Sequence, residues 1–315
     1  MSNAVSNIRA VIDIGTNSVK LLVAETADGS VRPLHEASEQ TRLGRGLYET
    51  GRLSAQSLRD TARVLERYAT DANNLESRSI RVVATSAARD AKNGDELADV
   101  VKQSTGSGLE IISGDQEASW VYRGVSSQSG MSGQPLLVSD VGGGSTELII
   151  GDQGECRFAH SFQLGTVRQL EDTTHSDPPS HAELNTTLDR LGNRIREEIV
   201  PRLREPLTSY KPAIDSIVGV GGTTTFLARI NHATDEFNRK QIETTRFETA
   251  DLKTLTEKLW NLSLEQRRNL PGLPPNRADV ILFGAAIYLA LLTELNLKTL
   301  LVSTRGVRFG ALLDS

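Results

Sequence analysis

Two stretches of this chain, 127 positions apart, follow nearly the same pattern. The first runs from Val11 to Glu25 (VIDIGTNSVKLLVAE), and the second runs from Leu136 to Gly151 (LLVSDVGGGSTELIIG). Each reads as an apolar strand, an aspartate, a glycine-containing tight turn with Ser or Thr, and a second apolar strand. When Asp13 is aligned with Asp140, the pairs that coincide are Gly15 with Gly142, Ser18 with Ser145, and Leu21–Val23 with Leu148–Ile150.

A turn of this kind exposes backbone N–H groups that can bind an anion. The aspartate at the strand end can hold a divalent cation, directly or through water. Two copies about half a chain apart therefore predict two similar domains that face each other across a phosphate-binding cleft.

The composition agrees with two folded domains. At 315 residues the chain is long for a single core. Hydrophobic residues make up 38% and charged residues 24%, which is typical of a soluble globular protein. The apolar run Val280–Leu292 is too short to cross a bilayer and predicts a buried helix. Residues 1–10 do not resemble a signal peptide, and Cys156 has no cysteine to pair with, so we expect a cytoplasmic protein without a membrane partner.

The formal net charge of −5 argues against a nucleic-acid partner, because such affinity comes from a basic surface. A polyanionic substrate is compatible with this charge if the counter-charge is local. The arginines that could supply it are Arg42, Arg45, Arg89, Arg168, Arg194, Arg305 and Arg308.

Hydrophobic periodicity predicts the same order of elements in both halves. We expect three early strands in each half, followed by alternating helices and strands. The division is predicted at residues 1–127 and 128–315, next to the polar, Gly-rich segment Ser126–Pro135. The longest helices are expected at Ser54–Leu75 and Ala182–Leu203. This duplicated order predicts an α/β, actin-like (ribonuclease H-like) two-domain fold with an interdomain cleft, although a fold alone does not fix the reaction.

Three glycine-rich turns are candidate phosphate sites. Two are the duplicated turns, and the third begins a helix after a strand, where the helix dipole favours negative charge. Glycine-rich turns are common as hairpins or caps, so the paired, aspartate-bearing copies carry most of the weight. The candidates are Gly15, Thr16, Asn17 and Ser18; Gly142, Gly143, Gly144, Ser145 and Thr146; and Gly221, Gly222 and Thr223.

Two charged residues can take part in phosphoryl transfer. Arg89 follows a predicted strand, where a guanidinium can bind a phosphate through two hydrogen bonds; alternatively, it pairs with Asp90 at a helix start. Glu117 is expected in the first turn of a helix, where a carboxylate could accept a proton from water. The alternative for Glu117 is an ordinary acidic residue that complements the helix dipole.

The succession of motifs resembles the exopolyphosphatase and guanosine pentaphosphate phosphohydrolase family, in its short two-domain form. The resemblance covers roughly residues 8–314 and is far more specific than any single motif. It implies an actin-like fold and hydrolysis of a terminal phosphoanhydride bond. The segments that carry it are VIDIGTNSVKLLV, ATSAARDAKN, ISGDQEA, DVGGGSTELIIG, LGTVR, GVGGTTTFLARI and RADVILFGA…LVSTRGVRFG.

The resemblance also implies roles for individual residues. Glu117 matches the catalytic glutamate that activates water, and Arg89 matches the phosphate-binding arginine. Asp140 and Glu147 match the acidic pair associated with Mg²⁺ or another divalent cation. Gly142 and Ser145 match one phosphate loop, and Asp13 with the turn Gly15-Thr16-Asn17-Ser18 matches the other.

The chain departs from the family pattern at three places. Gln116 stands where a second glutamate is often found, and Arg45 stands where an acidic residue is often found. The C-terminal HD-type helical domain of members with about 500 residues is not expected here. A homodimer could extend a basic track between subunits, and the sequence leaves this open.

The function expected from the resemblance is release of orthophosphate from the end of inorganic polyphosphate by Mg²⁺-assisted attack of water. Hydrolysis of guanosine pentaphosphate remains open, with Tyr48 or Phe226 available to stack on a base. A non-enzymatic sensor of polyphosphate or an alarmone also remains open, and so does an actin-fold kinase. No rival nucleophile is apparent among Cys156 and the histidines His35, His160, His175, His181 and His232.

Overall fold

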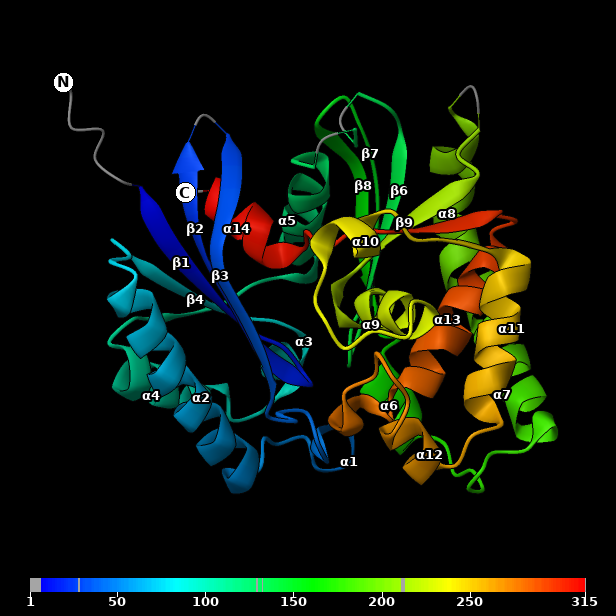
Figure 1. The fold of residues 1–315 in the computed structure, drawn as a ribbon, viewed down its shortest axis with the longest axis horizontal. Helices are drawn as coiled ribbons and strands as arrows, with labels where there is room; N and C mark the ends of the chain where they lie inside the picture. Colours follow the sequence, from blue (N-terminus) through cyan, green and yellow to red (C-terminus); the bar gives the residue numbers. More distant parts are fainter. Residues whose placement is uncertain (1–6, 28, 129, 132, 211–212, 315) are drawn as a thin grey trace. The chain divides into compact units, whose positions relative to one another are not determined.

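The computed structural model describes residues 7–314 except residues 28, 129, 132, 211 and 212. The described chain forms two compact units (Figure 1). The first contains the described residues before 129 together with residues 305–314, and the second contains residues 130–304. The sequence-based division assigns every residue after 127 to the second lobe. The C-terminal segment instead packs in the first unit, because its helix covers the first sheet.

The first unit is built on a five-stranded sheet in the order β3-β2-β1-β4-β5. Strands β1, β2 and β3 form an antiparallel meander, and β1, β4 and β5 run parallel. The bounds of the strands are β1 Ile8–Ile14, β2 Ser18–Ala27, β3 Ser30–Gln40, β4 Ile80–Ala84 and β5 Leu109–Ile111.

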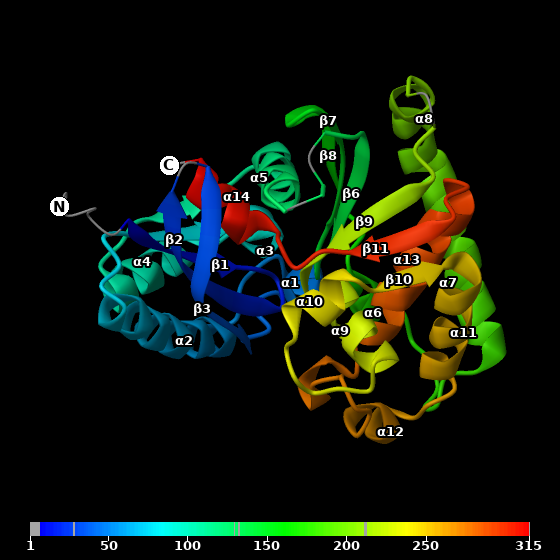
Figure 2. The ribbon, with the colours of Figure 1, turned by 45° about the horizontal axis from the view of Figure 1, so that its top comes forward.

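Helices cover both faces of this sheet (Figure 2). Helices α2 and α4 lie on one face, and α5 packs with α14 on the other face. Helix α2 starts where Ser54 caps it by accepting a hydrogen bond from the Ser57 N–H. The bounds are α1 Leu47–Thr50, α2 Ala55–Asn74, α3 Ser86–Asp90, α4 Gly94–Thr105, α5 Gly114–Ser126 and α14 Val307–Leu313.

The second unit repeats this topology. Its six-stranded sheet has the order β10-β11-β9-β6-β7-β8, so that β8-β7-β6-β9-β11 corresponds to β3-β2-β1-β4-β5, with β10 added antiparallel at the edge. This repetition confirms the predicted α/β, duplicated actin-like fold. The bounds are β6 Leu136–Val141, β7 Thr146–Asp152, β8 Glu155–Phe162, β9 Ser216–Val220, β10 Arg246–Glu248 and β11 Thr299–Val302.

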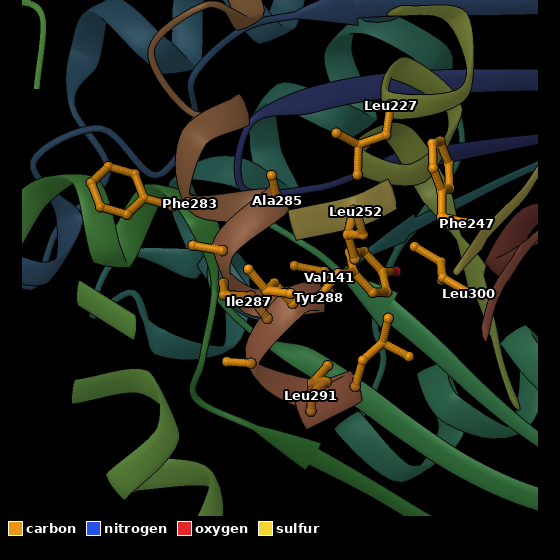
Figure 3. Packing of buried hydrophobic residues seen from close by; sticks show 14 of the residues in the cluster. Val141, Leu227, Phe247, Leu252, Phe283, Ala285, Ile287, Tyr288, Leu291 and Leu300 are labelled. Atoms are coloured by element: carbon orange, nitrogen blue, oxygen red, sulfur yellow. The ribbon is translucent and has the colours of Figure 1, made fainter. Parts of the chain in front are cut away.

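Helix α13 forms the centre of the second core, as the apolar run Val280–Leu292 predicts. Almost all of its side chains are buried, and it contacts α7, α11, β6 and β11 (Figure 3).

The long helix expected at Ala182–Leu203 is continuous but contains a π-helical turn at Ile195–Ile199. The remaining bounds are α6 Thr166–Glu171, α7 His181–Arg194, α8 Val200–Thr208, α9 Gly221–Asn231, α10 Arg239–Glu243, α11 Thr249–Trp260, α12 Leu264–Arg268, a 3₁₀ turn Pro275–Arg277 and α13 Ile281–Glu294. Among the helices described here, none is both long and apolar enough to cross a membrane.

Candidate functional site

The duplicated turns have the same backbone geometry. In the first unit the Gly15 N–H donates to the Ser18 carbonyl at 2.9 Å, and in the second the Gly142 N–H donates to the Ser145 carbonyl at 2.9 Å. Both turns lie at the carboxyl end of the first strand of their sheet, β1 or β6. That edge is where α/β sheets commonly bind ligands.

A following segment occupies the carbonyl groups of the first turn. The Arg42 N–H donates to the Asn17 carbonyl at 3.1 Å, and the Gly44 N–H donates to the Thr16 carbonyl at 2.8 Å. Within the described part of the chain, the N–H groups of Thr16 and Asn17 make no hydrogen bond. The turn therefore presents two unused donors, which is the chemistry of an anion site.

The second turn is covered in the same way by the start of α6. The N–H groups of Val167 and Arg168 donate to the Gly143 carbonyl at 2.8 and 3.1 Å, and the Arg168 Nε donates to the Gly144 carbonyl at 3.2 Å. Gly165 has to be a glycine, because a Cβ there would lie 2.3 Å from the Gly143 carbonyl oxygen. The described residues offer no hydrogen-bond partner to the N–H groups of Gly143, Gly144 and Ser145.

Several side chains of the predicted phosphate loops have structural partners. The Thr146 hydroxyl is fully buried and donates to the Leu164 carbonyl, and the Thr223 hydroxyl donates to the Val141 carbonyl at 2.9 Å. The Ser145 hydroxyl donates to Glu147 at 2.7 Å. In the first turn, the Asn17 Oδ1 accepts from Gln40 Nε2 at 2.8 Å. These contacts fix the turns and leave their backbone N–H groups as available donors.

Arg89 and Glu117, 28 positions apart, meet in the first unit. The Arg89 Nη1 donates to the Glu117 Oε2 at 2.7 Å and to the Ile112 carbonyl at 2.9 Å. Glu117 lies in the first turn of α5, yet only 7% of it is exposed, so it is not an ordinary solvated acid at a helix start. The ion pair thus holds the Glu117 carboxylate beside a positive charge, at 2.7 Å from the Arg89 Nη1.

The guanidinium of Arg89 is only partly used. Its Nε and Nη2 make no hydrogen bond to any residue that the structure describes. A guanidinium holds its five N–H groups in a rigid plane, so these two nitrogens can bind two oxygens of one phosphate while Nη1 stays on Glu117.

Asp13 occupies the end of β1 in an unfavourable environment. Its Oδ1 is buried and has no hydrogen-bond partner among the described residues. Burial raises the pKa of Asp13 above its ordinary value of 3.8, and the positive charges of Lys20 and Arg308 offset this only in part. A buried carboxylate repels phosphate, so Asp13 is suited to hold a cation or a proton rather than to touch a phosphate oxygen directly.

In the second unit the equivalent position has a different neighbour. Asp13 stands opposite Lys20 in the β1–β2 pair, whereas Asp140 stands opposite Glu147 in the β6–β7 pair. Side chains directly opposite in an antiparallel pair lie on the same face, with Cβ atoms about 5 Å apart. The two predicted metal ligands are therefore neighbours, and the first turn has no such acidic pair.

The Asp140–Glu147 pair suits a magnesium ion. Mg²⁺ commonly uses one or two carboxylates and takes its remaining ligands from water and substrate phosphates. No group of three or more His, Cys, Asp or Glu that could enclose a metal occurs in the described ranges. Glu147 is held in place because its Oε1 accepts from the hydroxyls of Ser145 and Ser161, at 2.7 and 2.6 Å.

The third glycine-rich turn lies beside Asp140. Gly221 has φ +85°, and a Cβ on it would lie 2.4 Å from the Asp140 Oδ1. Gly222 and Thr223 follow in the first turn of α9, so the positive end of that helix dipole is next to the Asp140 carboxylate. This arrangement stabilises the charge of Asp140, a role that sequence reasoning does not assign to the third turn.

Sequence reasoning also misses the two segments that cover the turns, residues 42–44 and 165–168. LGTVR stands out as a motif, but its function as a cover for the second turn depends on hydrogen bonds between distant parts of the chain. Ser161 is missed for the same reason: it reaches Glu147 only because β7 and β8 pair.

Proteins of known family show the same sequence pattern. Exopolyphosphatase 2 of Mycobacterium tuberculosis (strain CDC 1551 / Oshkosh) is 37% identical over 296 residues, which cover 91% of this chain and 90% of that protein. A Vibrio cholerae serotype O1 (strain ATCC 39541 / Classical Ogawa 395 / O395) protein named guanosine-5'-triphosphate,3'-diphosphate pyrophosphatase is 31% identical over 313 residues. That alignment covers 98% of this chain and 60% of the Vibrio protein, so the chain spans less than two thirds of this relative.

The fold agrees with these relatives. The crystal structure of the Aquifex aeolicus member of the Ppx/GppA protein family matches with a TM-score of 0.77 at 31% identity, over 98% of this chain and 96% of that one. The model of the Ppx/GppA phosphatase family matches residues 22–315. On these grounds, the chain belongs to the Ppx/GppA phosphatase family.

Proposed function

We propose that this protein is an exopolyphosphatase that releases orthophosphate from the end of inorganic polyphosphate. The observation that carries the proposal is the partly buried Arg89–Glu117 pair, whose guanidinium keeps two nitrogens for a phosphate. The relative named exopolyphosphatase 2, matched over 90% of its length, supports polyphosphate as the substrate. We propose a cytoplasmic location for this activity.

In the proposed reaction Glu117 accepts a proton from water while the water oxygen attacks the terminal phosphorus. The bond from phosphorus to the bridging oxygen breaks, and the shortened chain leaves with the electron pair. Arg89 binds the oxygens of the phosphoryl group under attack and offsets their charge. Within each unit, the unused N–H groups of its own turn are donors for phosphate oxygens. Asp140 and Glu147 would hold Mg²⁺, which neutralises negative charge on phosphate oxygens when bound.

Replacement of Glu117 tests the assignment. We expect Glu117→Gln to lower kcat for polyphosphate by about 10²- to 10⁴-fold, because a general base is lost while a hydrogen-bond acceptor for Arg89 remains. The matched control is Asp115→Asn, which removes the same charge from the same helix turn at an exposed position. Phosphate release that is equal in the two variants would contradict the role of Glu117.

The substrate is tested by phosphate release from long polyphosphate, short polyphosphate and guanosine pentaphosphate, each with and without Mg²⁺. We expect turnover of polyphosphate that requires the ion. Preferential turnover of guanosine pentaphosphate would identify that compound as the substrate in place of polyphosphate. Binding without any turnover would identify the protein as a sensor.

A further inference from the structure

The segment that covers the first turn also presents a free positive charge. Residues 42–46 pack directly on the turn, because Gly44 approaches Thr16 so closely that a Cβ on Gly44 would lie 2.3 Å from the Thr16 Cγ2. Arg45 follows at once, and its side chain is exposed. Among the described residues, the Arg45 guanidinium has no hydrogen bond and no ion pair.

The backbone of this segment is fixed at both ends. Arg42 has the left-handed φ of 52°, which is uncommon for a residue other than glycine, and its N–H bond to the Asn17 carbonyl holds it there. Beyond α1, the Lys92 N–H donates to the Gly51 carbonyl at 3.0 Å. The Asn93 side chain accepts a hydrogen bond from the Leu53 N–H and donates one to the Leu53 carbonyl. Lys92 and Asn93 follow α3, the helix that carries Arg89. The base of the Arg45 side chain is therefore held between the turn and the Arg89 segment.

Most exposed arginines of the first unit are used differently. They form ion pairs with nearby acids on the surface: Arg32 with Glu25, Arg52 with Glu96, Arg63 with Asp60 and Arg67 with Glu39. Arg78 is also exposed and unpaired within the described residues, but it precedes β4. Its N–H donates to the carbonyl of Ile8, which lies at the end of β1 opposite to the turn. Seven residues of strand, about 23 Å, separate that end from the turn.

We infer that Arg45 binds phosphate units of the substrate beyond the one held by the turn, and that it sets the affinity for long chains. The inference rests on the proposed exopolyphosphatase function. A polyphosphate bound at the N–H groups of Thr16 and Asn17 continues past the turn as a flexible polyanion. A long, unpaired guanidinium on the segment fastened to that turn can contact its next phosphates. In a protein of net charge −5, such a local cation is the counter-charge that a polyanion requires.

The test compares Arg45→Glu with Arg78→Glu, which makes the same charge change at the other end of the sheet. With long polyphosphate, we expect Arg45→Glu to raise KM on the order of 10-fold and to leave kcat nearly unchanged, because the lost contact exists both before and during the reaction. Arg78→Glu should leave both constants near the wild-type values, and Arg45→Lys should recover most of the affinity.

The dependence on salt provides a readout that a structural role would not change. A bound cation releases counterions from the polyanion, so the slope of log KM against log salt concentration should become shallower in Arg45→Glu and stay unchanged in Arg78→Glu. Equal KM values and equal slopes in the two variants would overturn the inference and leave the proposed function intact. A wild-type protein that releases no phosphate from polyphosphate would refute the function and the inference together.

Discussion

Asp13 lies in an environment that is unfavourable to its own charge. Its buried Oδ1 has no hydrogen-bond partner in the described structure. The nearby Arg308 guanidinium donates its hydrogen bonds to the Leu21 carbonyl and the Glu36 carboxylate instead. At the equivalent position in β6, the Asp140 carboxylate lies beside Gly221, the first residue of α9, and Asp140 stands opposite Glu147. The two aspartates of the repeat therefore differ: one is supported by a helix dipole, and the other is destabilised until a cation or a proton reaches it.

Asp13→Asn should raise the thermal stability at neutral pH by a few degrees, because it removes a buried charge that lacks a partner. The sign follows from the raised pKa. Below the ordinary value of 3.8, folded and unfolded chains both bind the proton, and the carboxyl group costs nothing. As the pH rises above that value the unfolded chain releases its proton first, so the wild-type protein loses stability until the folded pKa is passed.

The measurement is Tm for both proteins over a pH series from about 4 to about 8. We expect the difference to be small at the acid end and to grow with pH. If the variant is also less active, the carboxylate serves substrate or cation binding at the expense of stability. A variant less stable than the wild type at neutral pH would show that Asp13 has a partner in solution.

Among the elements, each of the two duplicated turns depends on a second segment. Residues 42–44 and 165–168 take up the carbonyl groups of the two turns, and this leaves the N–H groups as the unused ones. A turn without its cover would leave carbonyls and N–H groups equally available, and phosphate would meet both. In the proposed function, the covering segment is what makes the turn favour an anion.

Gly165→Ala should disable the second turn. The new Cβ would lie 2.3 Å from the Gly143 carbonyl oxygen, so the cover or the turn must shift. We expect a loss of about 1–3 kcal/mol in the free energy of unfolding, as for overpacked cores, together with weaker substrate binding. Chemical denaturation and KM for polyphosphate measure the two effects. Gly108→Ala is the control, since nothing lies within 4 Å of a Cβ there; equal effects would exclude the steric argument.

The turns and the segments that cover them differ in how far the sequence predicts them. The repeat between Asp13 and Asp140 is enough to predict two sheets of equal topology and the turn at the end of each first strand, because both follow from local pattern. The covering segments and the Arg89–Glu117 pair are contacts between distant parts of the chain. Periodicity carries no information about which glycine will meet which carbonyl, so only the resemblance to a family placed Arg89 and Glu117 in one reaction.

At the scale of the whole molecule, the two units are not consecutive in sequence. Helix α14 packs on α5 and the first sheet although it follows the entire second unit. Its buried side chains include Val307, Phe309 and Leu312, and the Ala311 carbonyl accepts from Arg81 Nη1 at 3.1 Å. The hydrophobic pattern predicts a last helix near Val307 but not the sheet that it covers, since either sheet has an apolar face.

Truncation after Thr304 should therefore damage the first unit and spare the second. Each large apolar side chain lost from a core removes roughly 1.5–3 kcal/mol, so several kcal/mol are expected in total. Hydrogen exchange would report this as faster exchange in β1, β2 and α5 with unchanged protection in α13. Equal loss of protection in both units would mean that they unfold as one.

The place of α14 in the chain also has a consequence for biosynthesis. A ribosome delivers the five strands of the first sheet early, but the helix that closes one of its faces emerges only after residues 130–304 have been made. During that interval the nascent sheet exposes apolar residues such as Val11 and Leu22. The second unit, continuous in sequence, is therefore synthesised in full before the helix that completes the first unit.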